Sequence, residues 1–210
     1  MIKAVLFDLD GVLIRTEHIN TESAVRSMHE QGIKLSADDK KLITGRNPVD
    51  YSIDFAKKYR FDRKKMIASH TKHYNKLYQT AKKFKYGRDF VLKVKKLGFK
   101  TALVTSSRRN TVGRALNFLG LKGAFDVLVT FEKCSKRKPS PLPYLIAARH
   151  LKVKPSECIV IEDSVAGVES AKRARMKCIA VTNSYPASKL KKADLIVRKL
   201  NDKRIIGMLC

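Results

Sequence analysis

The chain has 210 residues, 44% of them hydrophobic, and its 45 lysines and arginines against 19 aspartates and glutamates give a formal net charge of +26. This length suits one globular domain, or one domain that carries an insertion. No apolar run approaches the length of a membrane span and the N-terminus lacks the features of a secretory signal, so we expect a cytoplasmic protein.

The positive charge is spread along the whole chain, in pairs and triplets such as "DRKKM", "AKKFK" and "KLKKAD". It forms no single arm or stripe, and the sequence has no helix-turn-helix or zinc-finger signature. We therefore interpret the lysines as a solvated surface, with weak binding to nucleic acid at low salt as the most they predict. We expect a monomer with no specific nucleic-acid partner and no membrane partner.

The first predicted strand, Ile2–Phe7, leads into two aspartates, Asp8 and Asp10, in "FDLDGVL". The next predicted strand begins only at Thr101, which is far later along the chain than a crossover between parallel strands needs. Residues 16–85 show helical patterning, as in "TESAVRSMHEQG", and no convincing strand. We predict that 16–85 form an inserted all-helical cap domain, hinged near 14–16 and 85–88, which acts as a lid over the two aspartates.

After the insertion, short apolar runs alternate with helical patterns. Alternation of buried strands with helices is typical of a parallel sheet that is covered on both faces. We therefore predict an α/β fold, with a Rossmann-like parallel sheet formed by residues 1–15 and 86–210. The later strands are predicted at Thr101–Val104, Phe125–Val129, Cys158–Ile161, Cys178–Val181 and Leu195–Val197, and the helices at roughly 88–97, 109–119, 141–151 and 164–174.

Polar residues follow the strands at the edge where a parallel sheet binds its ligands. Asp8 and Asp10 follow the first strand, and Lys138 follows the third strand after a loop. The second strand is followed by Thr105, Ser106, Ser107 and Arg108, and the fourth by Glu162 and Asp163. Each of these short motifs, taken alone, is more often a turn, a helix cap or plain surface. Their order along the chain, each at a strand end, is what favours an active site.

This set of residues suits phosphoryl transfer. Carboxylate oxygens select a hard cation such as Mg²⁺, and the hydroxyls and amides at Thr105 and Ser106, which open a helix, can hold phosphate oxygens. Lys138 would neutralise the charge of the phosphate and of the acids. One carboxylate can attack phosphorus to give an aspartyl-phosphate, while its neighbour moves the proton of the leaving or entering oxygen.

The segments "FDLDGVL", "LVTSS", "KPSPLPYLIAA" and "VIEDSVAGVESAKRARM" resemble the four motifs of the haloacid dehalogenase superfamily. The resemblance covers essentially the whole chain and is closest to the subgroup of β-phosphoglucomutase and small sugar-phosphate phosphatases, which carry a helical cap in this place. It implies that Asp8 is the nucleophile and Asp10 the general acid/base, and that Thr105, Ser106 and Lys138 bind phosphate. It also implies an Mg²⁺ site at Asp8, Asp10, Glu162 and Asp163.

Three departures from that subgroup concern the reaction. The mutases carry a histidine four residues after the hinge threonine, and here Asn20 follows Thr16 at that distance. The cap loop lacks an arginine three residues after Gly45, and Arg137 stands where a glycine commonly precedes the lysine. These differences favour a phosphatase acting on a sugar phosphate or a phosphoglycolate-type metabolite over a β-phosphoglucomutase-like phosphomutase. A third hypothesis is a basic nucleic-acid-binding protein without turnover, which the complete set of acids disfavours.

The substrate contacts expected outside the core motifs are the least defined. Arg46 follows Gly45 in a short loop between two helical patterns, where a rigid turn can aim a planar guanidinium at an anionic group. Lys72 lies on a predicted helix of the same insertion. We predict that the substrate contacts come from Thr16, Gly45, Arg46, Lys72 and Arg108.

Overall fold

The computed structural model describes residues 1–209 and divides into two compact units. One unit consists of Met1–Ile14 with Lys83–Cys210, and we call it the core unit. The other is Arg15–Lys82, which we call the inserted unit. Cys210, the last residue of the predicted α/β domain, lies outside the described residues.

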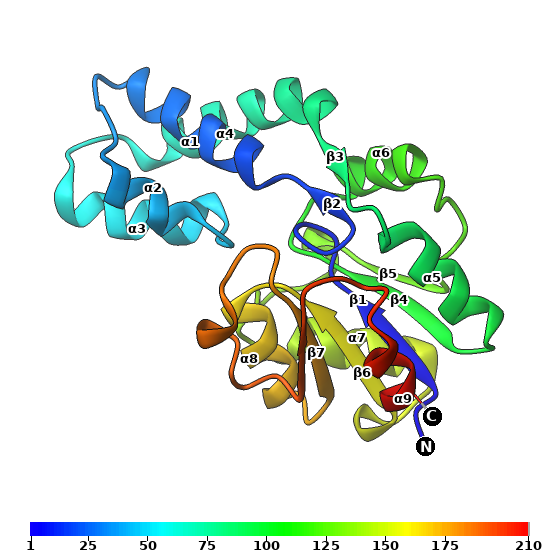
Figure 1. Cartoon of the computed structure of the whole chain (residues 1–210). Helices are drawn as coiled ribbons and strands as arrows, with labels where there is room; N and C mark the ends of the chain where they lie inside the picture. The colour runs from blue at the N-terminus through cyan, green and yellow to red at the C-terminus, as the bar shows by residue number, and fades with distance from the viewer. Residues whose placement is uncertain (210) are drawn as a thin grey trace. The chain divides into compact units, whose positions relative to one another are not determined.

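The core unit is built on a six-stranded sheet in the order β5-β4-β1-β6-β7-β8, and every neighbouring pair is parallel (Figure 1). β1 lies inside the sheet, between β4 and β6. All six predicted strands are confirmed, and with them the α/β fold class. The bounds are Ala4–Phe7 for β1, Lys100–Val104 for β4, Val127–Val129 for β5, Cys158–Glu162 for β6, Lys177–Val181 for β7 and Leu195–Val197 for β8.

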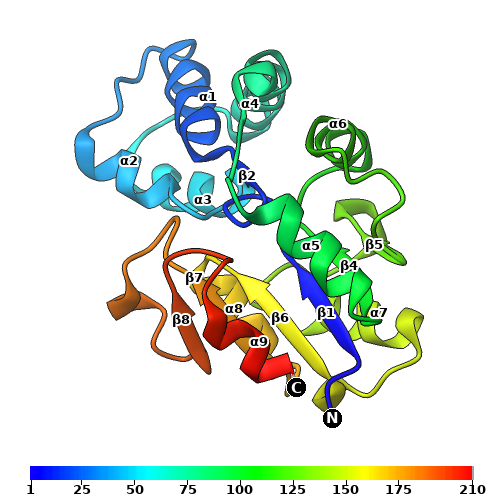
Figure 2. The same ribbon diagram turned by 45° about the vertical axis from the view of Figure 1, so that its right-hand side comes forward.

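Helices cover the two faces of this sheet (Figure 2). Alternate strand residues such as Ala4 and Leu6 pack in one cluster with α7 and α8. On the opposite face Phe7 meets Phe90 of α5 edge-on, with ring centroids 5.9 Å apart. The strands are thus apolar on both faces, which is why they appear in the sequence as near-continuous apolar runs. The helices are α5 (Gly87–Lys96), α6 (Arg109–Leu119), α7 (Leu142–Leu151), α8 (Val165–Arg173) and α9 (Lys203–Leu209), with short turns η2 (Phe131–Lys133), η3 (Pro155–Glu157) and η4 (Ala187–Lys189).

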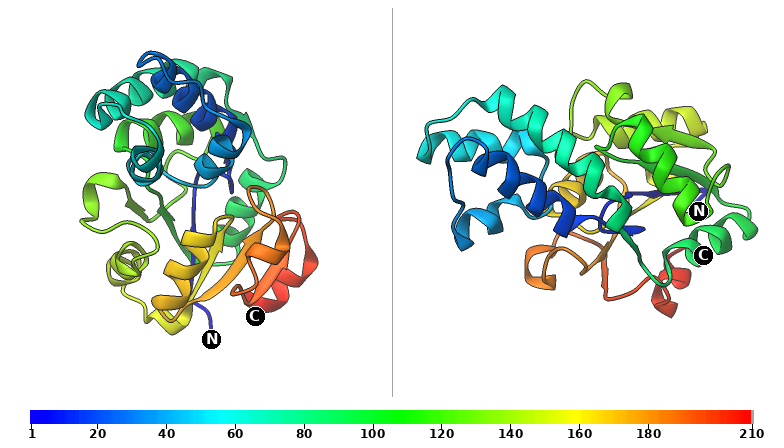
Figure 3. Two further views of the ribbon diagram at one scale, coloured as in Figure 1. Left: turned by 90° about the vertical axis from the view of Figure 1, so that its left-hand side faces the viewer. Right: turned by 90° about the horizontal axis from the view of Figure 1, so that it is seen from above.

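The inserted unit is helical, as predicted, and Figure 3 shows its helices from two sides. Residues such as Met28, Tyr51 and Met66 form its own buried core. None of the helices in residues 1–209 is both long and apolar enough to cross a lipid bilayer. The elements are α1 (Glu17–His29), α2 (Ala37–Ile43), α3 (Pro48–Lys58), α4 (Arg63–Leu77) and η1 (Tyr78–Thr80).

The structure differs from the sequence prediction in four short elements. α2 and α9 were not predicted, because seven residues are too few to establish a helical period. The start of α2 nevertheless carries a signal, since Ser36 and Asp39 form a capping box. The connecting segments also pair as two-residue strands, β2 (Ile14–Arg15) with β3 (Lys82–Lys83). Neither strand was predicted, and β3 lies inside 16–85, where we expected no strand.

Candidate active site

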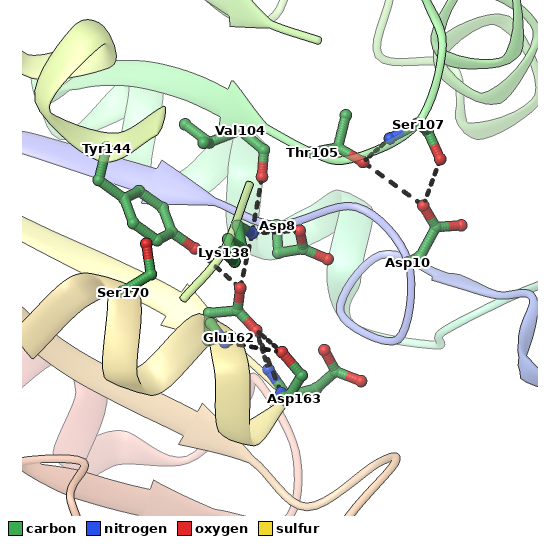
Figure 4. A network of polar contacts seen from close by, with 12 residues as sticks. Asp8, Asp10, Val104, Thr105, Ser107, Lys138, Tyr144, Glu162, Asp163 and Ser170 are labelled. Atoms are coloured by element: carbon green, nitrogen blue, oxygen red, sulfur yellow. Dashed lines mark hydrogen bonds and ion pairs between the residues drawn. The ribbon is translucent and has the colours of Figure 1, made fainter. Parts of the chain in front are cut away.

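The adjacent strands β4, β1 and β6 end at the same edge of the sheet, so the polar residues at their ends lie side by side. Phe7 is in register with Leu103 on one side and with Ile161 on the other. Asp8, Thr105 and Asp163 directly follow the three strands, and Glu162 is the last residue of β6. Parallel pairing therefore brings together residues that lie more than 150 positions apart (Figure 4).

The Lys138 ammonium lies at the centre of this group. Its Nζ donates to Asp8 Oδ1 at 2.6 Å, to Glu162 Oε1 at 2.6 Å and to the Val104 carbonyl at 3.0 Å. The lysine side chain is only 9% exposed. Burial lowers its pKa, but the charges of Asp8 and Glu162 outweigh burial and raise the pKa above its usual value, so the ammonium stays charged.

Glu162 is fully engaged in hydrogen bonds. Its Oε1 accepts from Lys138 and from the Tyr144 hydroxyl, which is 2.8 Å away. Its Oε2 accepts from the amides of Asp163 and Ser164 and from the Ser164 hydroxyl, at 2.9 to 3.1 Å. A Cβ at Gly167 would lie 1.8 Å from Oε1, so α8 approaches the carboxylate as only glycine allows. Glu162 is suited to holding Lys138, and this leaves Asp8 and Asp163 as the acids better placed to bind a cation.

Asp163 is held by segments that the sequence did not single out. The Ser184 hydroxyl donates to Asp163 Oδ2, and Asn183 Nδ2 donates to the Gly11 carbonyl at 2.6 Å. Gly11 has a φ of +83°, and a Cβ there would lie 1.8 Å from Asp163 Oδ2. The turn after Asp10, the loop after β7 and the end of β6 thus fit together around Gly11. Asn183 and Ser184 follow β7, so our strand-end argument, extended to that strand, would have found them.

The donor set fits a divalent cation. Among the described residues, Asp8, Glu162 and Asp163 are buried and each offers an oxygen, all within 4.8 Å of one another. Lys138 pairs with two of these carboxylates, those of Asp8 and Glu162. Burial raises the pKa of Asp8 to about 8, against the opposing pull of Lys138. Burial thus disfavours the charged form of this carboxyl, and a hard cation with oxygen ligands such as Mg²⁺ would stabilise that form.

Asp10 faces the loop after β4 and is not part of that three-carboxylate cluster. Its Oδ2 accepts from the Ser107 hydroxyl at 2.7 Å and lies 3.5 Å from the Thr105 hydroxyl. The Ser107 amide in turn donates to Thr105 Oγ1 at 3.0 Å. Of the two residues predicted to bind phosphate here, Thr105 is buried and Ser106 is exposed. Ser107 is the serine that touches Asp10, although our prediction for the phosphate contacts named only Thr105 and Ser106.

Two of the predicted substrate contacts, Gly45 and Arg46, are held by contacts within the inserted unit. The buried Thr16 precedes α1, and Lys72 is exposed on α4. The Gly45 amide donates to Glu17 Oε1 at 2.8 Å. The Arg46 guanidinium donates to Asp54 Oδ2 at 2.8 Å, a pairing that the sequence did not indicate. Arg108, in the core unit, is exposed, with its guanidinium 5.1 Å from the centroid of the Phe131 ring.

Asn20, which stands where the mutases have a histidine, also has a defined role in the inserted unit. Its Nδ2 donates to the carbonyls of Arg46 at 3.0 Å and Ile43 at 3.4 Å. Its Oδ1 accepts from His70 Nε2 at 3.1 Å. Burial lowers the pKa of His70 to about 4, so the ring is neutral at pH 7. Asn20 therefore ties the Arg46 loop to α1 and α4.

Comparison with known proteins identifies the family to which the chain belongs. The model of haloacid dehalogenase-like hydrolases matches residues 5–181, which include both aspartates, Lys138 and Asp163. The chain belongs to this family, as the resemblance of its four motifs predicted. It is accordingly an enzyme of the family's phosphatase class, and solved phosphomutases are among the proteins of similar structure.

Individual relatives are similar over nearly the whole chain. A validoxylamine A 7'-phosphate phosphatase from Streptomyces hygroscopicus subsp. limoneus is 31% identical over 206 residues, covering 97% of each chain. A phosphorylated carbohydrates phosphatase from Thermotoga maritima is 31% identical, covering 84% of this chain and 83% of its own length. A crystal structure of β-phosphoglucomutase from Clostridium difficile superposes with a TM-score of 0.82 at 28% identity, covering 100% of this chain and 97% of the other.

Proposed function

We propose that the protein is an Mg²⁺-dependent phosphatase that hydrolyses a small phosphorylated metabolite through an aspartyl-phosphate on Asp8. The observation that carries this proposal is the buried cluster of Asp8, Glu162 and Asp163, in which the Lys138 ammonium pairs with Asp8 and Glu162. Asp10 and the Thr105–Ser107 loop lie beside this cluster (Figure 4). Asp8 and Asp163 would hold the cation. When bound, the cation supplies positive charge that lets a phosphate approach the acids.

The reaction would proceed in two steps, formation of the aspartyl-phosphate and its hydrolysis. In the first, an Asp8 oxygen forms a bond to phosphorus, the bond to the leaving oxygen breaks, and Asp10 gives that oxygen its proton. In the second, Asp10 takes a proton from water, the water oxygen bonds to phosphorus, and the Asp8–phosphorus bond breaks. Lys138 and the Thr105 hydroxyl offset the charge of the transferring group.

A phosphate-release screen tests this proposal. Sugar phosphates, phosphoglycolate, glycerol phosphates and nucleotides are incubated with the enzyme and Mg²⁺, and with Asp8→Asn as the inactive control. Release from a sugar phosphate or from phosphoglycolate would support the proposed substrate class, and the name of the phosphorylated carbohydrates phosphatase favours the sugar phosphate. If the wild-type enzyme releases no phosphate from any of these compounds, the proposal is wrong.

A phosphomutase is the second candidate, because of the similarity to β-phosphoglucomutase. β-Glucose 1-phosphate separates the two: a mutase converts it to glucose 6-phosphate, whereas a phosphatase releases inorganic phosphate. Asn20 favours the phosphatase, since its amide is occupied in holding the Arg46 loop. The monomeric state and the cytoplasmic location remain predictions from the sequence.

Asp10→Asn is expected to lower the rate about 10²- to 10⁴-fold on a sugar phosphate, because the amide cannot move a proton. The p-nitrophenolate ion is a good leaving group, so aspartyl-phosphate formation from p-nitrophenyl phosphate should lose much less. Stopped-flow measurement of the first turnover gives both rates. Equal losses on the two substrates would contradict the role of Asp10 in protonating the leaving oxygen.

Arg46→Ala is expected to lower kcat/KM about tenfold or more on the best substrate of the screen, as for loss of a charge-assisted hydrogen bond to an anionic group. p-Nitrophenyl phosphate lacks such a second group and should be little affected. Asp54→Asn is the matched control, because it removes the partner and keeps the guanidinium. If Arg46→Ala lowers kcat/KM equally for both substrates, the substitution affects folding or closure of the inserted unit. If kcat/KM is unchanged for both, Arg46 is a surface residue without a role in substrate binding.

A further inference from the structure

The turn after β5 contacts the backbone of the loop that carries Thr105 and Ser107. Phe131 N donates to the Ser107 carbonyl at 3.0 Å. Both carboxylate oxygens of Glu132 accept from the Arg109 amide, at 3.1 and 3.3 Å. The Thr130 hydroxyl donates to the same Glu132 carboxylate at 2.8 Å and orients it. Two consecutive residues of the turn thus hold the loop at two points.

The Glu132 contact is a helix cap supplied from another segment. Arg109 is the first residue of α6, and the residue before it, Arg108, makes no side-chain cap of its own. A carboxylate that accepts from a first-turn amide also interacts favourably with the positive end of the helix. Glu132 therefore fixes where α6 begins, and with it the position of the residues just before the helix.

Phe131 links this loop to the segment that carries Lys138. The guanidinium carbon of Arg108 is 5.1 Å from the centroid of the Phe131 ring, and that of Arg137 is 5.4 Å from the same centroid. Both distances are in the range of cation–π contacts. One ring thus contacts the side chains that flank the two proposed phosphate-binding segments, because Arg108 follows Ser107 and Arg137 precedes Lys138.

We infer that Phe131 and Glu132 are positioning residues for phosphate binding. They fix the position of the Thr105–Arg109 loop relative to the Arg137–Lys138 segment. This inference rests on the proposed function for the identity of the ligand. Neither residue needs to touch the substrate. Their effect comes through Ser107, whose carbonyl is held by the turn and whose hydroxyl contacts Asp10.

The test compares Glu132→Ala with Glu132→Gln, whose amide oxygen can still accept from Arg109. Lys133→Ala, at the exposed next position, is the matched control. We expect Glu132→Ala to lower kcat/KM for p-nitrophenyl phosphate about 10- to 100-fold, since displacements of about 1 Å cost this much. The inhibition constant of inorganic phosphate should rise in the same variant. Glu132→Gln should recover most of both quantities, and Lys133→Ala should match the wild type.

The inhibition constant separates positioning from folding. A variant that merely loses some folded protein has a lower apparent kcat but an unchanged inhibition constant for phosphate. Phe131→Leu is the second variant, which keeps apolar volume and removes the π-face, and it should also raise the inhibition constant. If the inhibition constant is unchanged in both Glu132→Ala and Phe131→Leu, the inference is overturned while the proposed function stands.

Hydrogen exchange supplies a readout that does not need turnover. The Arg109 amide should exchange faster in Glu132→Ala than in the wild type and the Lys133→Ala control, because its acceptor is lost. If the wild-type enzyme neither hydrolyses p-nitrophenyl phosphate nor binds inorganic phosphate, the proposed function is wrong. Phosphate is then also excluded as the ligand of the positioned loop. If exchange at Arg109 is unchanged, the cap itself is contradicted.

Discussion

Asp8→Asn is expected to abolish turnover of every substrate and to leave the fold intact. The amide has nearly the same shape as the carboxylate, but it is a poor nucleophile and a weaker ligand for a hard cation. The fold should tolerate the change because Lys138 keeps its contact with Glu162, 2.6 Å away, and is not left unpaired. The amide also avoids the cost of burying a charged carboxylate, the cost that raises the pKa of Asp8.

Activity and thermal unfolding of the purified variant test this expectation together. Asp194→Asn is the matched control, since that carboxylate lies in the same unit, where it accepts from the Cys178 amide and pairs with Lys172. Unfolding temperatures within a few degrees of the wild type would show that the Asp8 variant is folded. More than a small residue of activity in folded Asp8→Asn would mean that water attacks phosphorus directly and that Asp8 serves as a ligand.

Removal of divalent cations by chelation and dialysis is expected to abolish phosphatase activity, and added Mg²⁺ should restore that activity. Without a cation, Asp8 and Asp163 would meet the phosphate with uncompensated negative charge at close range. Asp163→Ala should therefore raise the Mg²⁺ concentration needed for half-maximal activity sharply. Glu169→Ala on α8, a half-buried glutamate that pairs with Arg173 and Lys192, is the control and should leave that concentration unchanged.

The same site can be tested without turnover. A cation that binds the folded protein and not the unfolded chain raises the unfolding temperature, and the rise grows with the logarithm of the cation concentration above the dissociation constant. Mg²⁺ should thus stabilise the wild type and Glu169→Ala alike, and stabilise Asp163→Ala much less at the same concentration. Full activity after exhaustive dialysis against a chelator would exclude the cation from the reaction.

The sheet could be predicted from the sequence because each strand is buried on both faces. Six apolar runs that alternate with helical patterns leave few arrangements other than a covered parallel sheet, and Asp8, Thr105, Lys138 and Asp163 then follow from reading the strand ends. The elements that escaped prediction are short: α2 and α9 have seven residues each, and β2 and β3 have two. Such lengths carry too little periodicity to be recognised.

The hydrogen bonds that orient the site residues could not be predicted from the sequence for a different reason. Asn183 and Gly11 are 172 positions apart, and Glu132 meets the Arg109 amide across 23 positions. Nothing in the local pattern of either partner specifies the other, because the contact depends on where two loops leave the sheet. The Arg46–Asp54 pair is similar, since its formation depends on the turn at Gly45. The sequence thus predicted the acids and the lysine, whereas the structure supplies what orients them.

The most direct test of the account is to trap the aspartyl-phosphate. Asp10→Asn slows attack by water on the intermediate, and p-nitrophenyl phosphate forms the intermediate without help from an acid, so the phosphoenzyme should accumulate. The reaction with Mg²⁺ is quenched in acid, and the peptide containing residue 8 is analysed by mass spectrometry. The account predicts one added phosphoryl group on Asp8, absent from the Asp8→Asn, Asp10→Asn double variant. Turnover without any phosphorylated peptide, or with the phosphoryl group on another residue, would contradict it.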